Sequence, residues 1–177
     1  MTFRGVLFDW RGTLVVSPTF HAWVAEALRR LGRPAQGRTV DELAAVLERA
    51  GEDLDAPGTD ADTALHHSTY VRVLSGLGLD PELVRALYEV ESDPRSNAFA
   101  DDAVAVLRAL HDAGLRIAVI SDIHVDIRPA FAEAGLEDVV DVFTLSFEQG
   151  LQKPDPAMFT RTLDALGIAP PRGAHGR

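Results

Sequence analysis

One short apolar run that ends in a carboxylate constrains this chain more than any other feature. Residues 6–8 (VLF) are typical of a buried strand, and Asp9 follows at the strand's end. Gly12 then favours a sharp turn, which brings the hydroxyl of Thr13 back toward the carboxylate. In open α/β sheets the reactive crevice lies beyond the carboxyl ends of the strands. Asp9 is therefore a candidate nucleophile or metal ligand, although a role as a turn cap explains the same residue equally well.

Two later apolar segments predict further strands of the same sheet. Residues 115–120 (LRIAVI) end at Ser121, and residues 139–145 (VVDVFTL) lead into a loop that contains Lys153. Helical patterns alternate with these segments, which predicts parallel crossovers, so the strand ends share one edge. A carboxylate, a hydroxyl and an ammonium at that edge suit covalent catalysis, in which the carboxylate attacks and the other two groups hold negative charge.

The region between the first strand and the later ones shows helical patterns and no convincing strand. We expect helices that begin at Ser17-Pro18, at the capping-box pattern of residues 39–42, near residue 61 and at Asp80-Pro81. Residues 51–60 are rich in acidic and turn-forming residues, which predicts a loop. The segment from about residue 17 to residue 92 is thus interpreted as a helical insertion.

Composition excludes several classes of function. The net charge of −10 argues against nucleic acid as a partner, and the absence of cysteine excludes disulfides and a cysteine nucleophile. Residues 41–62 carry eight acids and one base, a pattern more typical of a solvated surface than of a cation site. The short N-terminal apolar run does not resemble a signal peptide, and no segment resembles a membrane span. We expect a cytoplasmic protein that does not bind membranes.

Three motifs in order resemble the haloacid dehalogenase (HAD) superfamily. They are residues 9–14 (DWRGTL), Ser121 after an apolar strand, and Lys153 within KPDP. The resemblance covers about residues 3–168, and the insertion lies where this family carries its helical type-1 cap. It implies an α/β fold with a Rossmann-like parallel sheet, flanking helices and an inserted helical cap. The implied boundaries are 1–16 and 97–177 for the core and 17–96 for the cap.

The resemblance also implies roles for individual residues. Asp9 corresponds to the nucleophile and, in phosphatase-like members, to a ligand of Mg²⁺; the backbone carbonyl of Arg11 corresponds to a second ligand. Ser121 and Lys153 correspond to the residues that hold the transferring group. The motif-adjacent residues Arg11, Thr13, Asp122 and His124 are candidates for contact with a small anionic substrate.

Two departures from the family pattern bear on function. Arg11 stands where the phosphatases have a second acid, and a guanidinium cannot act as a general acid near neutral pH. Arg11 could instead bind a substrate carboxylate or pair with Asp9. The family's fourth motif, a strand followed by Gly-Asp, is also absent, so we expect a truncated or frame-shifted end, an incomplete sheet and a basic tail over residues 170–177 that is frayed. The oligomeric state is left open.

These observations favour a phosphate-ester hydrolase that forms an intermediate on Asp9. A 2-haloacid dehalogenase is the alternative, since halide leaves without a proton, and a degenerate, non-catalytic HAD fold is another. Several single residues have two interpretations each. For His66 and His67 surface positions are favoured over metal ligation, and for Trp10 packing is favoured over lining the pocket. Asp126 and Asp155 could cap helices or shape the site.

Overall fold

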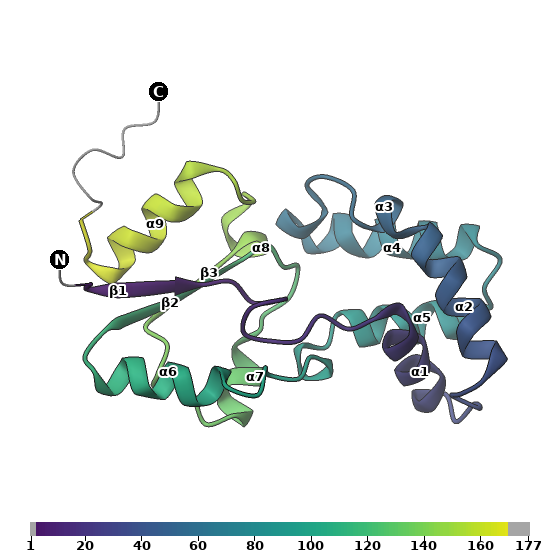
Figure 1. The fold of residues 1–177 in the computed structure, drawn as a ribbon. Coiled ribbons are helices and arrows are strands. Elements are labelled where there is room, and N and C mark those ends of the chain that lie inside the picture. The colour runs from purple at the N-terminus through teal and green to yellow at the C-terminus, as the bar shows by residue number, and fades with distance from the viewer. Residues whose placement is uncertain (1–2, 170–177) are drawn as a thin grey trace.

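The structure, a computed structural model, describes residues 3–169 and contains a parallel sheet at one end and a group of helices at the other (Figure 1). The tail at residues 170–177 lies outside the described residues. The elements in chain order are β1 (Gly5–Phe8), α1 (Phe20–Arg30), α2 (Arg38–Arg49), α3 (Gly51–Leu54), η1 (Thr59–Ala61), α4 (Thr63–Gly76), α5 (Pro81–Glu91), η2 (Pro94–Ser96), α6 (Ala103–Asp112), β2 (Arg116–Ser121), α7 (Arg128–Glu133), β3 (Val142–Leu145), α8 (Ser146–Gln149) and α9 (Pro156–Leu166).

The sheet has three parallel strands in the order β1-β2-β3 among the described residues. Helix α9 covers one face, and α6 and α7 cover the other (Figure 1). On the α9 face, the hydroxyl of Thr162 donates to that of Thr144 on β3 at 2.8 Å. The α/β class and the parallel sheet predicted from the sequence are confirmed, and β1 lies at an edge of the sheet in the described part.

The buried hydrophobic residues form two clusters. One lies within the helical insertion and includes Trp23, Leu47 and Leu74, and the indole of Trp23 donates to the carbonyl of Leu87 at 2.8 Å. The other lies against the sheet and includes Leu107 and Phe131. Because each cluster removes apolar surface from water separately, the insertion has its own source of stability.

Four local predictions differ from the structure. Helix α1 is capped by Thr19, whose hydroxyl accepts from Ala22 N at 3.2 Å, and not by Ser17, so the helix begins at Phe20, after Pro18. Helix α2 begins at Arg38 after Gly37, so Thr39 lies inside its first turn. The acidic segment predicted as a loop contains α3, because Leu54 is buried in the insertion's cluster. The loop after β3 likewise contains α8.

Strands β1 and β2 follow the sequence pattern closely, whereas β3 begins at Val142, three residues after the predicted start. Asp80 caps α5 through Leu83 N at 3.1 Å, with Pro81 in the first turn, as the sequence predicts. Helices α1 to α5 lie beyond the carboxyl end of β1 (Figure 1). Among the described residues, no helix is both long and apolar enough to cross a membrane.

Candidate active site

The register of the sheet determines which side chains can meet at its carboxyl edge. Phe8 on β1 pairs with Val119 on β2, so Asp9 and Ile120 are the next residues along their strands. Ser121 ends β2 and is only 2% exposed, whereas the side chain of Asp9 is 44% exposed. The predicted convergence at this edge is therefore present for the first two motifs.

Lys153 brings a cation onto Asp9 from the third motif. Its Nζ lies 2.7 Å from Asp9 Oδ2, and it also lies 3.5 Å from the carbonyl oxygen of Ile120. The other carboxylate oxygen, Oδ1, accepts a hydrogen bond from Trp10 N at 2.8 Å. These contacts fix the orientation of the Asp9 carboxylate beside the exposed end of the strand.

Asp122 holds the loop that carries the lysine. Its Oδ1 accepts from Lys153 N at 2.8 Å. Burial raises the pKa of Asp122, and the charges of Asp60 and Asp9 act in the same direction. Asp122 is thus a positioning residue for Lys153 and, because a raised pKa makes it a stronger base, a candidate for activating water.

Arg11 points away from Asp9 and onto the inserted helices. Its Nη1 lies 2.5 Å from Glu91 Oε1, and its Nη2 donates to the Glu91 carbonyl at 3.3 Å. Burial alone would lower the pKa of Arg11, but the adjacent Glu91 outweighs it, so the pKa is raised. The suggested pairing of Arg11 with Asp9 is therefore wrong, since the carboxylate of Glu91 at the end of α5 holds the guanidinium.

Motif analysis missed Glu91, although its position in α5 carries a signal. The buried face of α5 includes Val84 and Leu87, and Glu91 falls on the same face one or two turns later. An acid within an apolar stripe indicates a buried cationic partner, because an unpaired buried charge is costly.

The neighbouring candidates separate into packing and capping residues. Trp10 is fully buried against Phe99 and Phe131, which confirms the packing interpretation. Asp155 caps α9 by accepting from Ala157 N at 2.8 Å, whereas Asp126 accepts from Arg128 N at 3.0 Å in the turn before α7, whose N-cap position is Ile127. Thr13 lies exposed in the turn, and the side chain that the structure places on Asp9 is Lys153.

The two histidines of α4 differ sharply in environment. His67 is exposed, as expected, but His66 is 2% exposed, so the surface interpretation of His66 is wrong. Its ring stacks on His124, which is 1% exposed and follows the second motif. Adjacent helical positions do not face each other, and the ring that stacks on His66 belongs to the loop after β2 and not to His67. His124 lies behind the sheet edge in contact with the inserted helices, and the structure shows no contact between it and Asp9.

The residues around Asp9 fit a magnesium ion poorly. Mg²⁺ requires oxygen ligands in near-octahedral geometry. One oxygen of Asp9 pairs with a lysine and the other accepts from a backbone amide. Within residues 3–169, the one group of three or more His, Asp or Glu side chains close enough to share an ion does not include Asp9. Mg²⁺ at Asp9 stays a prediction from resemblance, and no step below is assigned to it.

A pocket of about 660 Å³ adjoins Arg11 on the side of the inserted helices. Its lining combines aromatic with acidic side chains, namely Phe20, Trp23, Tyr70, Glu48, Glu52, Asp55 and Glu91. Since Arg11 is already paired with Glu91, the remaining carboxylates give this pocket a negative potential.

Comparison with known proteins places this geometry in a family. The sequence profile of haloacid dehalogenase-like hydrolases matches residues 3–175. Haloacid dehalogenase-like hydrolase domain-containing protein 3 of Bos taurus is 30% identical over 93 residues. Those residues are 52% of this chain, and they span 37% of the length of the bovine protein.

Solved structures agree with the fold. An L-2-haloacid dehalogenase from Xanthobacter autotrophicus superposes with a TM-score of 0.65 at 24% identity, over 96% of this chain and 67% of that one. A HAD phosphatase from Thermococcus onnurineus superposes with a TM-score of 0.57 at 21% identity, over 94% and 73% of the two chains. With a profile match over residues 3–175, the chain belongs to the haloacid dehalogenase-like hydrolase family.

Proposed function

We propose that this hydrolase uses Asp9 to displace halide from a small 2-haloacid through a covalent aspartyl ester. The choice of halide as the leaving group rests on one observation, the ion pair between Arg11 and Glu91. It holds a permanently charged guanidinium where a phosphatase of this family has its proton donor. Halide leaves without a proton, so the reaction does not need the missing acid.

In the first step, a carboxylate oxygen of Asp9 attacks the carbon that bears the halogen. A carbon–oxygen bond forms, the carbon–halogen bond breaks, and the halide departs with the bonding electron pair. The ammonium of Lys153, 2.7 Å from Asp9 Oδ2, offsets the repulsion between the two anions as the substrate carboxylate approaches. The side-chain hydroxyl of Ser121, at the adjacent strand end, is the second group proposed to hold that carboxylate.

In the second step, water attacks the carbonyl carbon of the Asp9 ester. The acyl carbon–oxygen bond breaks, which releases a 2-hydroxyacid and regenerates the carboxylate, and one proton is lost to solvent. We assign the activation of this water to Asp122, whose raised pKa makes it a better proton acceptor than an ordinary aspartate. The contact of Asp122 with Lys153 N keeps it at the same edge of the sheet.

The charge of the pocket next to Arg11 opposes a dianionic substrate more strongly than a monoanionic one. The carboxylates that line it repel a phosphate dianion more strongly than a single carboxylate. Phosphate-ester hydrolysis, the function favoured by the sequence alone, is the second candidate, because the cation on Asp9 would also stabilise a phosphoryl group.

A substrate panel distinguishes the two candidates. The full chain is incubated with 2-chloropropionate and 2-bromopropionate, with halide release measured, and with p-nitrophenyl phosphate in the presence and absence of Mg²⁺. Release of halide without added metal supports the proposal, whereas phosphatase activity alone favours the second candidate. A folded protein that is inert on the whole panel contradicts both.

A further inference from the structure

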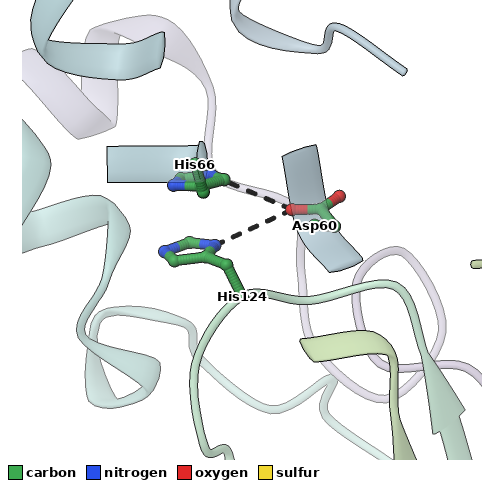
Figure 2. Close-up of side chains that lie close together, drawn as sticks. All are labelled: Asp60, His66 and His124. Atoms are coloured by element: carbon green, nitrogen blue, oxygen red, sulfur yellow. Dashed lines mark ion pairs between the residues drawn. The ribbon is translucent and has the colours of Figure 1, made fainter. Parts of the chain in front are cut away.

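A buried cluster of two histidines and an aspartate lies where the inserted helices meet the sheet domain (Figure 2). Asp60 belongs to η1, His66 to the second turn of α4, and His124 to the loop after β2. Both imidazole rings face the same carboxylate oxygen. His66 Nε2 lies 3.8 Å from Asp60 Oδ1, and His124 Nδ1 lies 3.7 Å from it.

These three residues are held in place by hydrogen bonds across the boundary between the two regions. The hydroxyl of Thr63 donates to the carbonyl of His124 at 2.7 Å, and Ser92 Oγ lies 3.1 Å from His124 Nε2. From the sheet domain, Ser146 Oγ donates to the Asp60 carbonyl at 2.6 Å. Because His124 Nε2 is engaged with Ser92, its Nδ1 is the ring nitrogen that faces Asp60.

The cluster has unsatisfied binding capacity. Among the described residues, His124 Nδ1, the atom that faces Asp60, is buried without a hydrogen-bond partner. Two imidazole nitrogens and one carboxylate oxygen are a ligand set typical of zinc sites.

We propose that Asp60, His66 and His124 bind a divalent transition-metal ion of the Zn²⁺ type. The three ligand atoms lie within 4.8 Å of one another. A point equidistant from three atoms with these spacings is roughly 2.0–2.4 Å from each, which spans the usual Zn–N and Zn–O bond lengths. Three protein ligands leave a further position for water or for a ligand group, as in zinc sites with an open coordination position.

The rings have to rotate for this ion to bind. They are stacked with centroids 3.3 Å apart and planes only 8° apart, whereas each nitrogen lone pair lies in its ring plane. An ion between the planes therefore draws the two rings out of parallel. Metal binding is expected to break the stack while keeping both residues buried.

The three ligands come from two regions of the molecule, so a bound ion would connect these regions. Asp60 and His66 belong to the helical insertion, whereas His124 belongs to the sheet domain, three residues beyond Ser121. An ion bound to all three ties the two regions together beside the second motif. This site is separate from any ion at Asp9, and it does not depend on which substrate the hydrolase uses.

Zinc binding to the metal-stripped full chain tests the proposal. Calorimetric titration with Zn²⁺ at pH 7 is expected to show one saturable site in the wild type. The affinity is expected to fall by at least about 100-fold in His66→Gln and in His124→Gln. His67→Gln, which removes the exposed neighbouring histidine from the same helix, is the matched control and should bind as the wild type does. Absorption of the Co²⁺ form reports the coordination independently of activity.

Asp60→Asn protects the test against misfolding of the histidine variants. The side chain of Asp60 is 29% exposed, so the amide is tolerated more easily than a change at a fully buried ring. Circular dichroism checks the folding of each variant. If a histidine variant does not fold, the Zn²⁺ affinity of Asp60→Asn decides the test in its place. Absence of a saturable site in the wild type overturns the proposal. Equal binding by the wild type and the folded ligand variants overturns it as well.

Discussion

Two polar centres lie at the boundary between sheet and inserted helices, and they differ in how the chain builds them. The Asp9–Lys153 centre joins the residue after β1 to the loop between α8 and α9. The Asp60–His66–His124 centre joins a short helix, an inserted helix and a loop of the sheet domain. Both groups of the first centre belong to the sheet domain, where Asp122 holds the loop of Lys153, whereas the second centre exists only when the insertion docks on the sheet. The first is therefore readable from sequence motifs and the second is not.

Substitution of the nucleophile Asp9 has the largest expected effect, and it tests whether the two centres act independently. Asp9→Asn should lower turnover of the active substrate by at least about 10⁴-fold, because the amide cannot form the ester. Zn²⁺ binding should stay unchanged, since Asp9 is not a member of the histidine cluster. Steady-state halide release and Zn²⁺ titration on the same preparation measure both. Asp112→Asn, an exposed change in α6, is the control, and loss of both properties in Asp9→Asn would contradict the separation.

The next effect tests the cation on the nucleophile. Lys153→Met keeps the length of the side chain and removes its charge, so the rate should fall by about 10²–10³-fold. The reason is the lost ammonium contact with Asp9 Oδ2. Comparison of kcat and KM between this variant and Lys153→Arg measures it, with partial recovery expected in the arginine variant. A Lys153→Met enzyme with wild-type kinetics would show that this ion pair has no part in the reaction.

The histidine centre makes the stability of the metal-free protein depend on pH. The pKa of His66 is about 3 in the folded chain and about 6.5 when unfolded, so the unfolded state binds more protons between these values. Stability is therefore complete above about pH 6.5 and should decrease as the pH falls toward 3, by on the order of 1–3 kcal/mol. The charged groups near the ring are His124, Asp60, Arg11 and His67, and the titratable rings of Tyr70 and Tyr88 also pack against it.

Urea unfolding in the presence of a chelator measures this dependence. His66→Gln should flatten the decrease in stability below pH 6.5, while His67→Gln should keep it. A decrease of the same size in wild type and His66→Gln would assign the pH dependence to other groups.

The smallest expected effect concerns the ion pair that links Arg11 of the first motif to Glu91 of the insertion. Glu91→Gln and Arg11→Met should each lower the free energy of unfolding by about 1–2 kcal/mol, because each leaves a partly buried charge without its partner. The double variant should lose about 1 kcal/mol less than the sum of the single losses. Chemical denaturation of the four proteins gives this coupling energy. Additive losses would mean that the observed pair does not contribute to stability.

Particular residues show how far the sequence reaches. The apolar runs before Asp9 and Ser121 predicted strands β1 and β2 and their shared edge, because strand burial leaves a local pattern. Asp80-Pro81 predicted the start of α5 for a similar local reason. The partner of Arg11 and the burial of His66 could not be predicted, since both depend on how α4 and α5 dock onto the sheet domain. Burial of the short helix α3 through Leu54 likewise depends on tertiary packing.

The central claim is that Asp9 becomes covalently attached to substrate, and isotope labelling tests it most directly. Excess enzyme is allowed a single turnover of the active 2-haloacid in H₂¹⁸O, and the peptide containing Asp9 and the product are analysed by mass spectrometry. The ester mechanism predicts ¹⁸O in the carboxylate of Asp9 and unlabelled oxygen in the 2-hydroxyacid, because water attacks the aspartyl carbon. Label in the 2-hydroxyacid with none in Asp9 would show direct attack of water on the substrate and would contradict the account.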